Sequence, residues 1–170
     1  MQRERTALWY LPLAALISSN LWFGLRWNLS LHETLLYIAS MICVGFVEEV
    51  IFRGLLFNAM RKDGLKSAVI VSSLTFGIGH IVNLFNGSGA QLLSNLCQVG
   101  YAAAIGFLFV ILFLKTGSLI PCIVTHSSVN ALSVFANEGG TTVAQEIFSA
   151  VAIAVIALAY AVYLLKKVPE

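Results

Sequence analysis

Long apolar runs separated by short polar breaks form the dominant pattern of the sequence. A transmembrane helix needs about 20 mainly apolar residues to cross a hydrocarbon core about 30 Å thick. We interpret six runs as such helices: Ala7–Phe23, Glu33–Met60, Ser67–Phe85, Leu92–Leu114, Leu119–Ala136 and Val143–Leu165. The pattern predicts an all-α fold, a polytopic transmembrane helix bundle that forms one domain over residues 1–170.

The first run also has features of a secretory signal peptide, because Arg3 and Arg5 precede an apolar stretch. Its end, Ser18–Leu21, lacks a clean cleavage pattern of small residues. We therefore expect the first run to be a retained membrane anchor.

Composition supports a membrane protein. The 170 residues are 59% hydrophobic and 11% charged, whereas soluble domains are about 45–50% apolar and about 25% charged. This difference excludes a soluble globular enzyme and a disordered tail, and the net charge of +2 is too small for a nucleic-acid binder. The three cysteines lie in apolar runs and form neither a disulfide framework nor a CxxC metal motif.

The basic residues predict the orientation of the bundle. When the six helices alternate in direction, eight basic residues lie on one side: Arg3, Arg5, Arg61, Lys62, Lys66, Lys115, Lys166 and Lys167. Only Arg26 lies on the other side, and Arg53 lies within a span. Because cytoplasmic loops carry the excess of Lys and Arg, we expect both termini to be cytoplasmic.

Three charged residues lie inside the second span: Glu48, Glu49 and Arg53. Each costs at least about 2.5–3.5 kcal/mol at mid-membrane, so such residues usually mark function. Glu49 and Arg53 are four residues apart and predict an ion pair on one helix face. Glu48 is about 100° away around the helix and needs a partner on another helix. The three could instead form a purely structural ion cluster.

His80, His126 and Asn130 also lie inside spans, and His126 and Asn130 share one helix face. Counted from the basic loops at 1.5 Å per residue, Glu48, His80, His126 and Asn130 lie at depths of roughly 20, 21, 17 and 23 Å. A single buried histidine is more often a hydrogen-bonded core residue, and His32 in an external loop receives only that interpretation. The shared depth instead predicts one polar site near the middle of the bilayer.

Other side chains give weaker signals. Gly77 and Gly79 would let helices approach closely. Ser94, Gln98 and Tyr101 recur at helical spacing, which suits a wet cleft as well as cross-links between helices. The side chains that we assign to a substrate cleft are Phe52, Phe76, Gln98 and Tyr101.

Three motifs in successive parts of the chain resemble one family. They are Glu-Glu-x-x-x-Arg at 48–53, Phe-x-x-x-His at 76–80 and His-x-x-x-Asn at 126–130, within a core of about residues 33–136. Together they resemble the CAAX-protease and bacteriocin-processing family, the Rce1-type glutamic intramembrane proteases. The resemblance implies that Glu48 and His80 activate a water, that His126 and Asn130 stabilise the oxyanion, and that Glu49 and Arg53 support them. Rce1-type members usually have more spans than the six expected here, which leaves the substrate open.

The residues also bear on cofactors. Amide hydrolysis needs a base for water, donors for the oxyanion and an acid for the leaving nitrogen. The sequence has no GxSxG elbow, which disfavours a serine mechanism. We favour a mechanism without metal or cofactor, because an Asn one turn from His126 is useful for an oxyanion but is not needed by zinc. The alternative is a catalytic zinc ion held by Glu48, His80 and His126, although no HExxH motif is present.

We therefore expect an intramembrane endopeptidase that cleaves near the C-terminus of a membrane-associated protein or peptide. One alternative is a non-catalytic membrane partner, such as a bacteriocin-immunity or chaperone-like factor, that holds a peptide with the same polar cluster. Another is a small transporter with a carboxylate proton relay. The expected partners are the peptide substrate and the lipid bilayer, without nucleic acid, and the short loops suggest a prokaryotic cytoplasmic membrane. The sequence specifies neither the substrate nor the oligomeric state.

Overall fold

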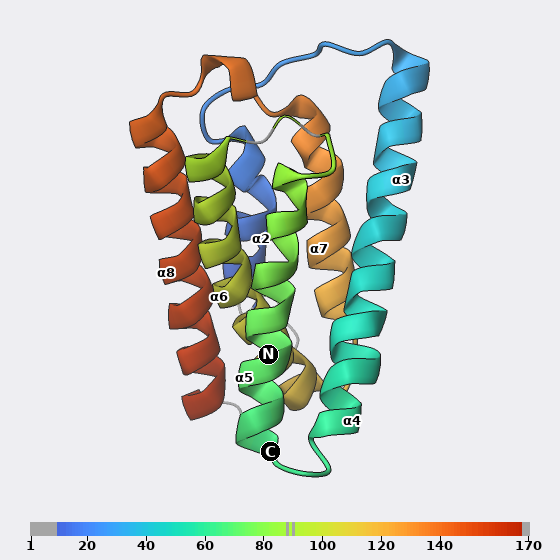
Figure 1. The fold of residues 1–170 in the computed structure, drawn as a ribbon, viewed down its shortest axis with the longest axis vertical. Coiled ribbons are helices and arrows are strands. Elements are labelled where there is room, and N and C mark those ends of the chain that lie inside the picture. Colours follow the sequence, from blue (N-terminus) through green and yellow to red (C-terminus); the bar gives the residue numbers. More distant parts are fainter. Residues whose placement is uncertain (1–9, 88, 90, 168–170) are drawn as a thin grey trace, which may run out of the picture.

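The computed structural model describes residues 10–87, 89 and 91–167, and its regular elements are all helices that run side by side in a bundle (Figure 1). This confirms the predicted all-α fold. The elements are α2 (Leu11–Ile17), η1 (Ser18–Leu21), α3 (Leu31–Glu49), η2 (Val50–Phe57), α4 (Asn58–Met60), α5 (Leu65–Gly79), η3 (His80–Leu84), α6 (Leu92–Thr116), α7 (Ile120–Leu132), η4 (Ser133–Phe135), η5 (Glu138–Gly140) and α8 (Val143–Lys167).

Within the part of the chain that the structure describes, four helical segments are long and apolar enough to cross a membrane: Leu31–Met60, Leu65–Leu84, Leu92–Thr116 and Val143–Lys167. They match the predicted second, third, fourth and sixth spans within two residues at each end. Two shorter apolar segments, Leu11–Leu21 and Ile120–Phe135, correspond to the predicted first and fifth spans. Both are shorter than the about 20 residues of a full crossing, so the count of six crossings stays a prediction. The predicted start at Ala7 lies outside the described residues.

Local signals at the helix ends explain these bounds. α3 begins with a capping box, in which the Ser30 hydroxyl accepts from the Glu33 backbone amide and the Glu33 carboxylate accepts from the Ser30 amide. α6 ends at Gly117, whose φ of 66° is left-handed and suits glycine. A proline, Pro121, then lies in the first turn of α7. The turn between α6 and α7 is therefore short, and the two helices are neighbours in the bundle.

Helix α6 is the central element of the core. It packs against α5 and α8, while α3 packs mainly against α7 (Figure 1). Buried residues of α6 such as Leu108, Phe109 and Leu112 meet Ala157 and Tyr160 of α8 in the larger apolar cluster. The bundle therefore leaves α3, which carries Glu48 and Glu49, near one edge.

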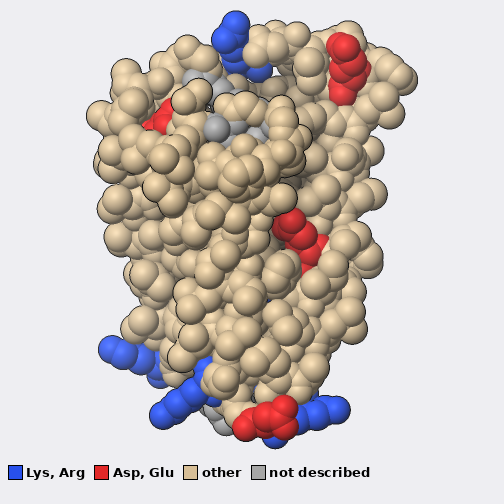
Figure 2. Space-filling view, viewed as in Figure 1, with Lys and Arg blue, Asp and Glu red and all other residues tan. Residues whose placement is uncertain are grey.

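The charged side chains gather at the two ends of the bundle, with one acidic group halfway between them (Figure 2). The basic residues at one end come from the α4–α5 turn and the last turns of α6 and α8: Arg61, Lys62, Lys66, Lys115, Lys166 and Lys167. Arg26 lies at the other end, as predicted, and Arg3 and Arg5 lie outside the described residues. That the basic end faces the cytoplasm stays a prediction of the charge rule.

Glycines allow close helix contacts at specific positions. A Cβ atom at residue 77 would lie 2.7 Å from the backbone nitrogen of Ala103 and 2.8 Å from the carbonyl oxygen of Val99. A Cβ atom at residue 79 would meet no atom within 4 Å. The predicted close approach is therefore confirmed at Gly77, where α5 meets α6, and wrong at Gly79.

This difference predicts opposite outcomes for two neighbouring substitutions. Gly77→Ala is expected to lower the free energy of unfolding by roughly 1–3 kcal/mol, because backbone atoms of α6 must move to admit the methyl group. Gly79→Ala is the matched control, and its φ of −53° suits alanine. We expect it to change stability little or to raise it by up to about 1 kcal/mol. Thermal unfolding in detergent measures both, and equal destabilisation by the two substitutions would contradict the assignment.

Candidate active site

The segment that carries the acidic motif is π-helical over Val50–Phe57, directly after Glu49. The apolar pattern predicted a regular α-helix over these residues, and that prediction is wrong for Val50–Phe57. π-Helical turns are rare and often lie at functional sites, because the extra residue shifts side chains relative to the helix axis. The Ser72 hydroxyl of α5 donates to the Phe52 carbonyl oxygen at 3.0 Å and ties this segment to α5.

Glu49 and Arg53 form the ion pair that their spacing predicts. Nη1 of Arg53 donates to Oε1 of Glu49 at 2.9 Å, and both side chains are fully buried. Nη2 donates to the Gly106 carbonyl oxygen at 3.2 Å, and the guanidinium lies 4.2 Å from the ring centroid of Phe76 and 5.3 Å from that of Phe109. The cation therefore joins the acidic segment to α5 and α6.

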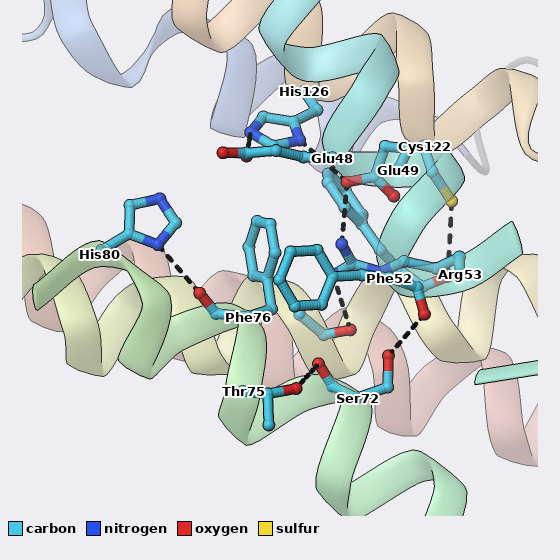
Figure 3. Close-up of polar contacts among 12 residues, drawn as sticks. Glu48, Glu49, Phe52, Arg53, Ser72, Thr75, Phe76, His80, Cys122 and His126 are labelled. Atoms are coloured by element: carbon cyan, nitrogen blue, oxygen red, sulfur yellow. Dashed lines mark hydrogen bonds and ion pairs between the residues drawn. The ribbon is translucent and has the colours of Figure 1, made fainter. Parts of the chain in front are cut away.

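Glu48 finds the interhelical partner that its position requires. Its Oε2 lies 3.4 Å from Nε2 of His126 on α7. The other ring nitrogen of His126, Nδ1, donates to Oε1 of Glu49 at 2.8 Å. One imidazole thus lies between two carboxylates, and Figure 3 shows it next to both.

The charges of this cluster can cancel. Nδ1 of His126 must carry a proton to donate to Glu49, which leaves Nε2 facing Glu48 as an acceptor for a proton that Glu48 has taken up. When Nε2 holds that proton the ring is an imidazolium, and with Arg53 it balances the two carboxylates. Near-neutral clusters are favoured where water is scarce. The Glu48–His126 contact is therefore a place where one proton can move between oxygen and nitrogen.

Glu48 and Glu49 differ sharply in environment. The Glu48 side chain is 34% exposed, whereas that of Glu49 is 0% exposed and paired with Arg53. The acidic group visible halfway along the molecule in Figure 2 lies at the level of this cluster. Glu48 is consequently the carboxylate that an incoming molecule can reach.

His80 lies at the C-terminal end of α5, and a hydrogen bond to one of its ring nitrogens fixes the orientation of the ring. Nδ1–H donates to the Phe76 carbonyl oxygen at 3.0 Å, which leaves Nε2 of the neutral ring as an acceptor. The Asn95 side-chain amide of α6 donates to the His80 carbonyl oxygen at 2.8 Å. Figure 3 shows the Glu48 carboxylate extending toward the side on which His80 lies. The two make no direct hydrogen bond in the described part of the chain, and the predicted mechanism needs none because it puts a water between them.

Asn130 follows His126 by one turn of α7 and is half-buried. Among the described residues its side-chain amide has no hydrogen-bond partner, while its carbonyl oxygen accepts from the Ser133 hydroxyl at 2.7 Å. The amide is thus available to donate to a bound group, as the oxyanion role requires.

The expected metal alternative finds no assembled ligand set. Within residues 10–87, 89 and 91–167, no three His, Cys, Asp or Glu side chains are grouped so that they could hold a metal ion. Glu48 and His126 are adjacent, but both ring nitrogens of His126 face carboxylates, and His80 is not grouped with them. These residues do not fit a three-ligand zinc site as they stand.

The four side chains assigned to a substrate cleft lie in two places. Phe52 and Phe76 meet edge to face with ring centroids 5.2 Å apart beside the acidic cluster, and Phe76 also lies against His126 at 5.4 Å (Figure 3). Gln98 and Tyr101 instead line a separate hollow of about 430 Å³ between η1, α6, α7 and α8.

Three parts of the site were missing from the sequence analysis: Asn95, Gly106 and Phe109. Asn95 is 1% exposed, and its amide within an apolar run of the sequence was a signal that could have identified it. Gly106 and Phe109 act through a backbone carbonyl and an aromatic face toward Arg53. No pattern in the sequence marks such contacts.

The fold and the cluster define an integral membrane protein with a buried ion pair, a reachable carboxylate and two imidazoles between its charged ends. A family model described as type II CAAX prenyl endopeptidase Rce1-like matches residues 30–132, which is more than half of the chain. The chain belongs to the Rce1-like family, and the resemblance stated from its motifs is confirmed. No curated protein and no solved structure matches it significantly. Family membership supports a CAAX-type intramembrane endopeptidase in general.

Proposed function

We propose that this protein hydrolyses a peptide bond near the C-terminus of a membrane-associated protein or peptide, with a water activated by Glu48 and His80. The observation that carries the proposal is the pairing of two adjacent carboxylates with unequal environments. Glu49 is paired with Arg53, while Glu48 is partly exposed and, among the described residues, has the His126 imidazole as its ion-pair partner. Two acids in different environments can take different roles in proton transfer.

In the proposed first step Glu48 removes a proton from the water, and Nε2 of His80 accepts the water's second hydrogen bond. The resulting hydroxide oxygen forms a bond to the carbonyl carbon, and the carbonyl electron pair moves to its oxygen. A base of this kind contributes about 10²–10⁴ in rate. Both side chains are partly exposed, which supports access of a water to them.

The oxyanion is proposed to bind His126 and Asn130. Because Nδ1–H of His126 donates to Glu49, Nε2 becomes a donor only when the ring is an imidazolium. The proton that Glu48 takes from the water can pass across the 3.4 Å contact to Nε2, which creates this donor as the negative charge forms. The Asn130 amide is the second donor. The C–N bond then breaks as the leaving nitrogen receives the proton through Glu48, which restores the starting charges.

The experiment is hydrolysis of a farnesylated CAAX peptide by the purified protein in detergent or nanodiscs. We choose this probe because the family description names CAAX prenyl endopeptidases. Mass spectrometry is expected to find two products whose combined mass exceeds the mass of the intact peptide by one water. We place the reaction in a prokaryotic cytoplasmic membrane, so membrane vesicles that contain the protein should cleave the same bond.

We also propose that the reaction needs no metal. Strong chelators such as EDTA and 1,10-phenanthroline are expected to leave the hydrolysis rate unchanged, because the water is activated by side chains alone. The same peptide assay measures this rate. Complete loss of activity with a chelator, followed by recovery on addition of Zn²⁺, would instead indicate a catalytic zinc ion.

A further inference from the structure

A second polar region lies beside the acidic cluster and has no role in the chemistry proposed above. It is the hollow of about 430 Å³ between η1, α6, α7 and α8, here called the polar hollow. Most of its lining consists of side chains that can form hydrogen bonds, among them Asn20, Ser94, Asn95, Gln98, Gln145 and Ser149. Such a lining is unusual between helices that cross lipid, because polar groups at membrane depth are costly unless they serve a purpose.

The polar hollow reaches the catalytic layer. Gln91, at the start of α6, lines it, and so does Ile105, about 20 Å further along that helix at 1.5 Å per residue. Ile105 precedes Gly106, whose carbonyl oxygen accepts from Arg53. On α7 the hollow is lined by Val129, the neighbour of Asn130. The hollow therefore leads from the end opposite the basic loops to the level of the acidic cluster.

Asn95 links the hollow to the catalytic residues directly. Its amide nitrogen donates to the His80 carbonyl oxygen at 2.8 Å. Its carbonyl oxygen, Oδ1, is buried and has no hydrogen-bond partner among the described residues, although the side chain lines the hollow and is 1% exposed. A buried acceptor without a partner requires an explanation, and a bound N–H group would supply one.

A membrane peptide presents the matching chemistry. The peptide bond that is cut must leave its helix, because a helical backbone hides the carbonyl carbon from the attacking water. Unwinding exposes N–H and C=O groups that lipid cannot satisfy, so these groups need polar partners supplied by the enzyme. The polar hollow offers such partners at the required depth, next to His80.

We propose that the polar hollow binds the unwound segment of the substrate that adjoins the scissile bond, with Asn95 Oδ1 accepting one of its backbone N–H groups. This rests on the proposed endopeptidase function, since only a peptide that is to be cut needs an unwound segment. The occupant is peptide backbone, and the prenyl group of a prenylated substrate lies elsewhere.

A native cysteine reports on the hollow. Cys97 lines it, whereas Cys43 is exposed on α3 and Cys122 is buried. A charged methanethiosulfonate reagent modifies thiolates that water reaches. In nanodiscs we expect it to label Cys97 and to spare both Cys43, which lies within a segment that crosses the lipid, and the buried Cys122. Mass spectrometry assigns the site, and Cys97→Ser removes the signal.

Protection by ligands then tests the occupant. The experiment uses the Glu48→Gln variant, so that the farnesylated CAAX peptide is not consumed. At ten times its dissociation constant, the peptide should slow Cys97 labelling about tenfold. Farnesylcysteine methyl ester, which has the lipid but no peptide segment, should give no protection.

Three results would overturn the assignment: no labelling of Cys97, labelling without protection by the peptide, or equal protection by the farnesylcysteine ester. Hydrolysis by the wild-type protein is measured in parallel. Hydrolysis without protection would refute the polar hollow as the peptide site and leave the endopeptidase function intact. Protection without hydrolysis would refute the proposed function for this peptide and leave the binding site intact.

Discussion

Replacing Glu48 by glutamine is expected to abolish peptide hydrolysis while the protein folds and accumulates normally. The amide has nearly the same shape as the carboxylate but cannot take a proton from water. We expect kcat to fall by about 10²–10⁴, the usual contribution of a positioned base. Stability should change little, because the Glu48 side chain is 34% exposed and contacts His126 only at 3.4 Å. The farnesylated CAAX peptide assay gives kcat, and thermal unfolding in detergent checks the fold.

Asp63→Asn is the matched control for this loss. Asp63 is an exposed acid in the turn between α4 and α5, and the same change there removes one negative charge at the basic end. We expect its kcat to equal that of the unmodified protein. A Glu48→Gln protein that keeps its hydrolysis rate would refute Glu48 as the base. If Glu48→Ala and His80→Ala both kept full biological activity at normal protein level, the non-catalytic partner would become the better assignment.

The helices could be predicted closely from the sequence because lipid imposes a simple rule. Apolar runs must be helical to satisfy their backbone groups, and turn residues such as Gly117 end them. The predicted bounds of the fourth span, Leu92–Leu114, differ from α6 by two residues at one end. Whether the two shorter helices cross the membrane fully could not be decided from apolar length, since both are shorter than a full crossing requires.

The candidate site was predictable where contacts are local or where lipid makes polarity expensive. The Glu49–Arg53 pair follows from a spacing of four residues, and the shared depth of Glu48 and His126 follows from counting residues. The contact of His126 with both carboxylates depends on how closely α7 approaches α3, which Gly45 permits beside Ser127. Such packing is a property of two helices together and leaves no periodic signal in either.

The π-helical segment could also not be predicted from the sequence. Its residues, Val50–Phe57, have the same apolar character as a regular helix and contain no proline. The segment is tied to its neighbours through the Phe52 carbonyl oxygen, bound by Ser72, and through the Arg53 side chain. Tertiary contacts of this kind can favour a wider helical turn that local propensity alone does not specify.

Replacing Arg53 by methionine is expected to cause the largest loss of stability of any single change in the cluster. Arg53 and Glu49 are both 0% exposed, so removing the cation leaves a buried carboxylate with His126 as its remaining partner. Breaking a buried ion pair from one side costs about 3–5 kcal/mol, a large share of the about 5–15 kcal/mol that stabilises a typical domain. We expect a much lower yield in membranes and a clearly lower melting temperature in detergent.

Three companion variants separate the charge from the packing of this side chain. Arg61→Met, at an exposed position beyond α4, removes the same charge and should leave stability unchanged. Glu49→Gln combined with Arg53→Met removes both charges and should recover part of the lost stability, because no uncompensated charge stays buried. Arg53→Lys should be less stable than the native protein, since an ammonium cannot bond both Glu49 and the Gly106 carbonyl oxygen as the planar guanidinium does. A double variant that is less stable than Arg53→Met alone would show that shape and ring contacts, rather than charge balance, fix Arg53 in place.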